Sequence, residues 1–291
     1  MKTKRSPKDY GNESISSLKG ADRVRKRPAV IFGSDGIDGC QHSVFEILSN
    51  SIDEAREGYG DVINVTRFED GSIEIEDFGR GIPLDYNQNE QRYNWELVFC
   101  ELYAGGKYRN IEGESYEYSL GLNGLGSCAT QYSSAYMDVT VIFNGFRYFI
   151  HFEKGENKTG TPEGFVKELV TTKKTGTKIR WKPDLDVFTD ISVPLEYYLD
   201  TLKRQAVVNA GLRFVLKDQR GHSFETYEFC YENGVVDYLS ELAGDDPLTS
   251  PQFIKTEKSG RDREDKPEYK VKMEIAFLFD KAKSSLEYYH N

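Results

Sequence analysis

Two side chains that could act on a phosphate lie four residues apart in the stretch 43–54. Glu46 offers a carboxylate that could deprotonate water, and Asn50 offers an amide oxygen that suits Mg²⁺. Apolar residues recur beside them at helical spacing: Val44, Ile47, Leu48 and Ile52. This spacing predicts an amphipathic helix over 41–57, with both polar groups on one face. We interpret it as a helix that lines a nucleotide pocket, with Glu46 as general base and Asn50 as metal ligand.

A second candidate follows a predicted strand, where Asp77, Gly79 and Gly81 alternate with other residues. A buried carboxylate accepts a hydrogen bond from an exocyclic amine, so Asp77 could select adenine. The two glycines would let the backbone approach a base without a clash from Cβ. Taken alone, this motif more often marks a turn, and a Glu and an Asn four apart on a helix are more often a surface pair.

The third candidate is a glycine-rich run that precedes a predicted helix ending near residue 133. Its backbone N–H groups could cradle phosphates. The run comprises Gly121, Leu122, Asn123, Gly124, Leu125 and Gly126. Lys107 lies in a polar, aromatic stretch that suggests a mobile loop, so it could reach phosphates or could equally be a solvated lysine. The sequence around it is not a P-loop, because Glu101 and Tyr108 stand where that motif requires Gly and Ser or Thr.

These groups need a fold that brings distant segments together. Alternating apolar and polar residues predict hairpins over 62–76 and 137–153 and further strands at 165–171, 177–181, 213–217 and 225–229. Helices are predicted over 16–25, 94–103, 194–209 and 235–242, and an extended piece follows Pro28. After a linker at 245–251, the stretches 253–256, 269–279 and 286–289 are strand-like. The pattern indicates an α+β fold, with helices on one face of a mostly antiparallel sheet.

Composition limits the class of protein. The 291 residues are enough for about two structural units, and 38% hydrophobic with 30% charged residues is ordinary for a soluble globular protein. No apolar run approaches the roughly 20 residues of a membrane-spanning helix, and the basic N-terminus lacks the apolar core of a secretory signal. Four scattered cysteines indicate reduced cytosolic thiols, and the four histidines show no metal-ligand spacing. The net charge of -10 argues against broad nonspecific binding of nucleic acid.

In their order along the chain, these motifs resemble those of the Bergerat-type ATPases. The closer resemblance is to the ATPase region of the B-type subunits of bacterial type IIA topoisomerases, and it covers nearly the whole chain. The segments that carry it are 18–28 (LKGADRVRKRP), 45–55 (FEILSNSIDEA), 77–83 (DFGRGIP), 104–108 (AGGKY) and 174–183 (KTGTKIRWKP). The resemblance implies a two-layer α+β sandwich with an eight-stranded, mostly antiparallel sheet. It also implies an N-terminal dimerisation arm at 1–17, an ATPase domain at 18–244, and the start of an α/β, ribosomal S5-like transducer domain at 245–291, so that the chain would be a fragment.

The same resemblance implies roles at the phosphate end of a nucleotide site. Glu46 would be the general base and Asn50 the Mg²⁺ ligand. Lys107 and the run 121–126 would form a lid over the phosphates. The bacterial family usually has a histidine within that run, where this sequence has Asn123; asparagine also occurs there in eukaryotic relatives, so binding is expected to be kept.

At the adenine end, the resemblance implies that Asp77 binds the base with help from a water molecule and from Thr177. Arg80 and Glu54 would form a buried pair beside the adenine, and Pro83 would lie near the rim of the pocket. Gly79 and Gly81 would let the backbone approach the base.

Further expectations concern the arm, drug binding and partners. Tyr10 and Ile15 would belong to an arm that crosses to a second copy of the chain, with Tyr10 at the partner's nucleotide. Phe143 takes a strand position where gyrase usually has an arginine that contacts coumarin drugs, so weaker coumarin binding is expected. ATP and Mg²⁺ would drive dimer closure and DNA passage in a cytoplasmic heterotetramer with a DNA-cleaving A-type subunit, without a membrane.

Two other functions remain open at this point. The chain could be a non-enzymatic module that holds nucleotide as a structural switch, and hydrolysis by the longer chain with DNA would distinguish it. It could also be a chaperone or histidine kinase on the same fold. The segments 18–28 and 174–183 disfavour a chaperone and a histidine kinase, and no phosphoacceptor histidine motif is visible.

Overall fold

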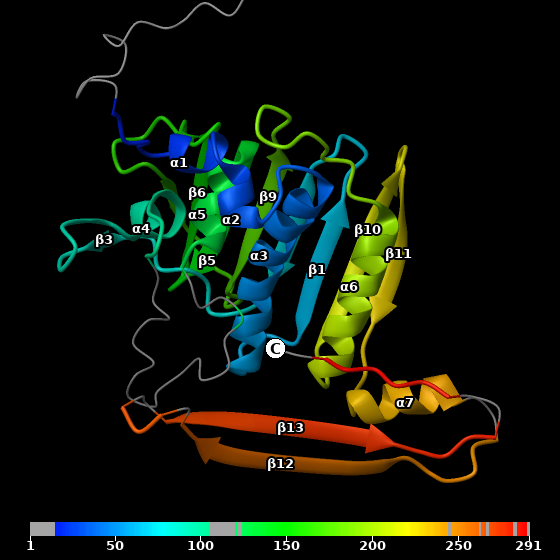
Figure 1. The fold of residues 1–291 in the computed structure, drawn as a ribbon. Helices are drawn as coiled ribbons and strands as arrows, with labels where there is room; N and C mark the ends of the chain where they lie inside the picture. Colours follow the sequence, from blue (N-terminus) through cyan, green and yellow to red (C-terminus); the bar gives the residue numbers. More distant parts are fainter. Residues whose placement is uncertain are drawn as a thin grey trace, which may run out of the picture.

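The computed structural model describes residues 15–104, 120, 124–243, 246–261, 263–265, 268–281 and 284–289. Within these ranges, two layers make up most of the fold: a large twisted sheet and a set of helices that cover one of its faces (Figure 1). The α+β class and the mostly antiparallel sheet agree with the expectation from sequence.

The large sheet contains nine strands within the described residues, in the order β11-β10-β1-β2-β9-β5-β6-β7, with β8 also paired to β6. Their bounds are β1 Val62–Arg67, β2 Ile73–Asp77, β5 Ser134–Phe143, β6 Phe146–Glu153, β7 Glu156–Asn157, β8 Val166–Leu169, β9 Gly176–Pro183, β10 Arg213–Arg220 and β11 Ser223–Phe229. A separate small hairpin joins β3 (Tyr86–Asn87) to β4 (Arg92–Tyr93).

Strands β1 and β10 form the one parallel pair among the described strands of this sheet. The Arg67 guanidinium, at the end of β1, lies 2.6 Å from the fully buried carboxylate of Asp218 on β10. It also donates a hydrogen bond of 3.3 Å to the carbonyl of Val193. This ion pair therefore fixes the register of two strands that no short turn connects.

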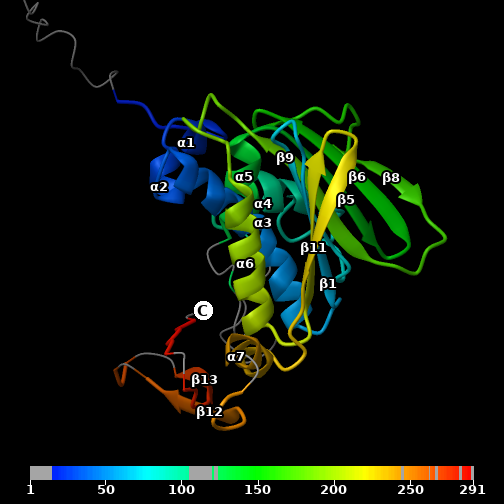
Figure 2. The same ribbon diagram turned by 90° about the vertical axis from the view of Figure 1, so that its right-hand side faces the viewer.

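The helices are α1 (Asp22–Arg25), α2 (Pro28–Phe32), α3 (Ile37–Arg56), α4 (Asn94–Cys100), α5 (Gly126–Tyr132), α6 (Leu195–Val208) and α7 (Val235–Ala243). Figure 2 shows α3, α5 and α6 on the same side of the sheet. The apolar stripe predicted for α3 is buried against the sheet. It meets alternate residues of the strands, such as Ile75, Ile179 and Val139, which lie side by side across three strands. Burial of that stripe holds α3, and the polar groups that it carries, in a fixed place.

A second sheet of two strands, β12 (Gln252–Gly260) and β13 (Tyr269–Phe277), lies apart from the large sheet and packs beside α7 (Figures 1 and 2). Several of its apolar side chains are exposed, including those of Phe253, Ile254, Val271 and Met273. Within the described ranges, no helix combines the length and the apolar character that a membrane span requires.

Several expectations about local structure are wrong, among them the helix predicted over 16–25, of which only α1 (Asp22–Arg25) is helical. Within the described residues the sheet has nine strands rather than eight, because the two-residue strand β7 pairs with β6 in a segment where no strand was predicted. The piece after Pro28 is the short helix α2, since proline suits the first helical turn and Gly33, at φ 78°, ends it. Helix α3 begins at Ile37, earlier than expected, because Gly39 does not interrupt it. The described residues of 286–289 form no strand.

Candidate functional site

Helix α3 presents Glu46 and Asn50 toward the beginning of α5. A Cβ atom placed on Gly126 would lie 2.2 Å from Oε2 of Glu46. The side-chain amide of Asn50 donates hydrogen bonds to Oγ of Ser127, at 3.2 Å, and to the carbonyl of Glu46, at 3.0 Å. Any side chain at position 126 would therefore displace the Glu46 carboxylate. The predicted base and the predicted metal ligand lie together, where the glycine-rich run ends.

Asp77, a residue that is 8% exposed, ends β2, and its carboxylate is surrounded by donors. One oxygen accepts hydrogen bonds from the backbone N–H groups of Gly79 (3.0 Å) and Thr177 (3.2 Å). The other accepts one from the hydroxyl of Ser51, at 2.9 Å. Burial raises the pKa of Asp77 above its ordinary value, although these donors act in the opposite direction. Because Ser51 belongs to α3, the same helix holds this carboxylate and carries Glu46.

After Asp77, the backbone of the chain passes close to strand β5. Gly81 has a φ of 81°, and a Cβ there would lie 2.6 Å from the carbonyl oxygen of Ile142 on β5. Only glycine fits such a position without moving the strand. Pro83, two residues further on, is exposed.

Glu54 and Arg80 form the ion pair that the resemblance implied. The guanidinium donates to both carboxylate oxygens of Glu54, at 2.8 and 3.0 Å. The ring of Tyr59 lies 4.2 Å from the guanidinium carbon. A two-point hydrogen bond with a stacked ring restricts the orientation of Arg80 strongly. The pairing of Glu54 with Arg80 is confirmed, but the pair is not buried as expected, because the two side chains are 21% and 36% exposed.

Asp53 ties α3 to the glycine-rich run. Its side chain is 1% exposed, and one carboxylate oxygen accepts a hydrogen bond of 2.7 Å from the backbone N–H of Leu120. Leu120 directly precedes Gly121. Helix α3 therefore contacts both sides of this run, at Leu120 and at Gly126.

His42 belongs to the site, although its spacing gave no signal of metal binding. It lies one turn before Glu46 on α3, with Nε2 3.1 Å from Oε1 of Glu46 and Nδ1 3.1 Å from the carbonyl oxygen of Phe32. The hydrogen bond to Glu46 raises the pKa of His42 above its ordinary value of 6.5. A histidine four residues before a candidate base was the available sequence signal.

The raised pKa of His42 predicts a pH-dependent contribution to stability. The protonated imidazole stabilises the folded chain fully below pH 6.5, and this contribution is lost as the pH rises through the raised pKa of the folded state. We expect His42→Gln to lower the free energy of unfolding more below pH 6.5 than well above it. Urea unfolding over a pH series measures this difference. The control is His222→Gln, in the exposed turn after β10, and a pH-independent effect of His42→Gln would contradict the prediction.

Five of the predicted binding residues lie outside the described residues: Tyr10, Lys107, Gly121, Leu122 and Asn123. Gly124 and Leu125 lie inside them, directly before α5, and Gly124 has a φ of 58°.

The donor set suits a magnesium ion that is bound mainly by phosphate oxygens and water. No group of three or more His, Cys, Asp or Glu side chains within the described ranges could hold a metal ion on its own. Asn50 could contribute a neutral oxygen, and Glu46 lies one turn away on the same helix. Mg²⁺ typically keeps several waters and uses one or two protein ligands beside substrate phosphates, which these residues fit.

Comparison with curated proteins finds similar chains along most of the sequence. This chain is 36% identical over 255 residues to the B subunit of DNA gyrase from Treponema denticola, covering 86% of this chain and 39% of that protein. It is 33% identical over 274 residues to the B subunit of DNA topoisomerase 4 from Enterococcus faecalis, covering 94% of this chain and 37% of that protein. The chain thus spans about two fifths of the length of these relatives. No protein-family model matches it.

A solved structure has a similar fold. The 43K ATPase domain of Thermus thermophilus gyrase B, crystallised with an aminocoumarin, superimposes with a TM-score of 0.69 at 31% identity. The match covers 90% of this chain and 63% of that one. The fold described above, with its large mostly antiparallel sheet and its helices on one face, is that of this domain.

Proposed function

The chain belongs to the family of DNA gyrase and topoisomerase IV B subunits, and from this premise we propose that it binds ATP with Mg²⁺ and hydrolyses it. The observation that carries the proposal is the position of three groups on or against one helix. Glu46 and Asn50 project from α3 toward Gly126, and Ser51 of the same helix holds the buried carboxylate of Asp77. One end of such a site suits an adenine amine and the other suits a metal-bound phosphate.

At the adenine end, Asp77 would accept a hydrogen bond from the exocyclic amine of the base. The N–H groups of Gly79 and Thr177 and the hydroxyl of Ser51 hold the carboxylate in one orientation. A guanine would present a carbonyl oxygen at that place, which a carboxylate repels. The paired Arg80 would border the base.

At the phosphate end, Glu46 would orient a water molecule and take its proton as the water attacks the terminal phosphate. His42 would keep the Glu46 side chain in place through their hydrogen bond. Asn50 would hold Mg²⁺, which when bound neutralises part of the phosphate charge. The backbone of the run 121–126, with Lys107, would surround the phosphates.

Binding of nucleotide is tested by calorimetry on the chain itself. We expect ATP with Mg²⁺ and adenosine to bind, with guanosine weaker than adenosine by at least about 100-fold. Equal binding of guanosine and adenosine would reject Asp77 as the recognition group. Slow release of phosphate from ATP, measured with protein in excess, separates hydrolysis from a purely structural nucleotide site.

We further propose the role of the whole protein and the division of this chain. Residues 1–17 would form an arm that crosses to a second copy, with Tyr10 at the partner's nucleotide. Residues 18–244 would be the ATPase domain, and 245–291 would begin the transducer domain. ATP would close the dimer as a gate for duplex DNA in a cytoplasmic assembly with an A-type subunit. A relaxation and cleavage assay on the full-length protein with its partner tests this role.

Phe143 predicts weakened binding of coumarin drugs. It ends β5 beside Ile142, whose carbonyl oxygen borders Gly81, and it replaces an arginine expected from the family. An arginine donates charge-assisted hydrogen bonds worth about 1.5–3 kcal/mol, so Phe143→Arg should tighten binding of an aminocoumarin about tenfold or more. Calorimetric titration measures the change, with Phe149→Arg on the adjacent strand as control. No gain in the Phe143→Arg variant would contradict the prediction.

A further inference from the structure

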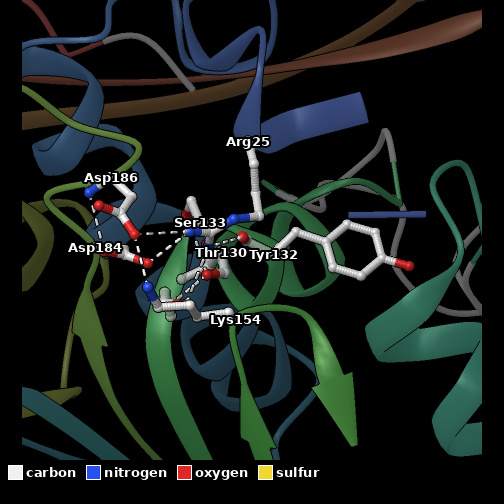
Figure 3. Close-up of polar contacts among 8 residues, drawn as sticks. Arg25, Thr130, Tyr132, Ser133, Lys154, Asp184 and Asp186 are labelled. Carbon is white, nitrogen blue, oxygen red and sulfur yellow. Dashed lines mark hydrogen bonds and ion pairs between the residues drawn. The ribbon is translucent and has the colours of Figure 1, made fainter. Parts of the chain in front are cut away.

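Arg25 joins the N-terminal helix α1 to the far end of α5 (Figure 3). One nitrogen of its guanidinium donates hydrogen bonds to the carbonyl oxygens of Tyr132, at 3.1 Å, and Ser134, at 3.5 Å. The other terminal nitrogen lies 2.6 Å from the carboxylate of Asp184, beyond the end of β9. A single side chain thus holds the last residue of α5, the first residue of β5 and the segment after β9.

The guanidinium of Arg25 and its main partner are mostly buried. The side chains of Arg25 and Asp184 are 15% and 8% exposed. Asp184 is itself fixed, because its N–H donates to the carbonyl of Ser133 and its second oxygen accepts the N–H of Asp186, both at 3.0 Å. Lys154 lies 2.6 Å from Asp186 at the exposed edge of the cluster. Removing one partner of such an ion pair leaves a buried charge uncompensated, so the contact strongly favours one geometry.

Helix α5 connects this cluster to the candidate phosphate end. It has seven residues, from Gly126 to Tyr132, and is therefore about 10 Å long. Besides the bond from Asn50 to Ser127, the hydroxyl of Thr130 donates to the carbonyl of Ser43 on α3, and the hydroxyl of Tyr132 donates to the carbonyl of Cys100 on α4. Seven residues of regular helix form one rigid element, so a shift at Tyr132 would reach Gly126.

We infer that Arg25 is a positioning residue for the phosphate end of the site. By holding Tyr132, it sets where Gly126 stands against Glu46 and where Ser127 meets Asn50. The coupling is reciprocal: phosphates that favour this position of α5 also strengthen the attachment of α1. This inference rests on the proposed binding of ATP and adds a residue of α1 to the groups on which that binding depends.

The adenine end of the site is held in place by other residues. Asp77 is held by Ser51, Gly79 and Thr177, and none of these hydrogen bonds involves α5 or Arg25. Loss of the Arg25 contacts should therefore weaken binding of the phosphates and spare binding of the base. The ratio of affinities for a nucleotide and its nucleoside isolates this effect from a general loss of structure.

The test compares adenosine with a non-hydrolysable ATP analogue and Mg²⁺ by calorimetry on the whole chain. Arg25→Met keeps the length of the side chain and removes its hydrogen bonds. We expect the affinity for the ATP analogue to fall about tenfold, within the usual range of coupling between sites. The affinity for adenosine should change less than about twofold.

Arg67→Met is the matched control for loss of stability. Arg67 has the same kinds of partner, the buried carboxylate of Asp218 at 2.6 Å and the carbonyl of Val193, but it lies at the junction of β1 and β10. We expect this variant to lower the unfolding temperature and to leave the ratio of the two affinities as in the unchanged chain.

Two milder variants keep the test decisive if Arg25→Met does not fold. Asp184→Asn removes the charge of the partner and keeps its shape, so the ratio should shift in the same direction by about threefold. Arg25→Lys keeps the charge and loses the two-sided contact, so it should restore part of the loss.

The outcomes separate the inference from the proposed function. If the unchanged chain binds neither adenosine nor the analogue, the proposed function fails. If it binds both and the variants at Arg25 and Asp184 leave the ratio unchanged, or lower both affinities as Arg67→Met does, the positioning role is rejected. A selective loss for the analogue supports it.

Discussion

Replacing Asp77 with asparagine should abolish binding of adenine nucleotides and leave the chain folded. The side-chain oxygen of asparagine can accept the two N–H groups from Gly79 and Thr177, and its amide can donate to the hydroxyl of Ser51. The local hydrogen bonds are therefore kept. The second acceptor oxygen is replaced by an NH₂ group, of which one hydrogen can bond to Ser51 and the other would face the donor amine of adenine without an acceptor. An affinity loss of at least about 100-fold follows from an unmade hydrogen bond plus a buried unpaired donor.

Calorimetry with adenosine and with ATP measures this loss. The matched control is Glu76→Gln. Glu76 precedes Asp77 on β2, and its carboxylate interacts with Asn64 and Lys178 rather than with the groups that hold Asp77. That variant should bind adenosine as the unchanged chain does. Unchanged affinity of Asp77→Asn for adenosine would reject Asp77 as the adenine acceptor.

Replacing Glu46 with alanine should keep nucleotide binding and remove hydrolysis. A positioned general base contributes about 10²–10⁴-fold to a rate, and alanine supplies no acceptor for the proton of water. Binding should persist because Asp77 and the groups around it are untouched. Glu46→Gln, which keeps the shape and loses the basicity, should show the same loss of rate.

Single-turnover release of phosphate with protein in excess measures the rate, since the chain alone is expected to turn over slowly. Calorimetry with ATP on the same preparation shows whether binding is intact. Asp38→Ala, in the first turn of α3, is the control for removal of a carboxylate from this helix. Undiminished hydrolysis by Glu46→Ala would assign the proton transfer to another group.

Periodicity predicted the elements that hold the site because long apolar stripes leave a clear signal. Helix α3 and the hairpin that ends at Asp77 are of this kind, and the structure contains both. Strand β7 has two residues, too few to show alternation, and α2 has five, little more than one helical turn, and both were missed. The pair of Glu54 and Arg80 came from the family resemblance rather than from spacing.

Contacts between distant segments could not be read from the sequence. The hydrogen bond from Leu120 to Asp53 joins residues 67 apart, and the contact from Arg25 to Asp184 joins residues 159 apart. No local pattern encodes either, because each depends on how the helices pack on the sheet. His42 was missed for a different reason: it was assessed as a metal ligand, whereas its partner is the carboxylate one turn away.

The parallel pairing of β1 with β10 has a consequence for how the chain folds. The contact between Arg67 of β1 and Asp218 of β10 joins residues that are 151 apart in the sequence. Its formation therefore requires closure of a very long loop. The hairpin of β1 and β2 can form much earlier from neighbouring residues. Until β10 docks, β1 presents a row of unpaired backbone groups beside buried-type side chains such as Ile63 and Val65. The strand that lies inside the finished sheet is thus an open, aggregation-prone edge while the chain is being made.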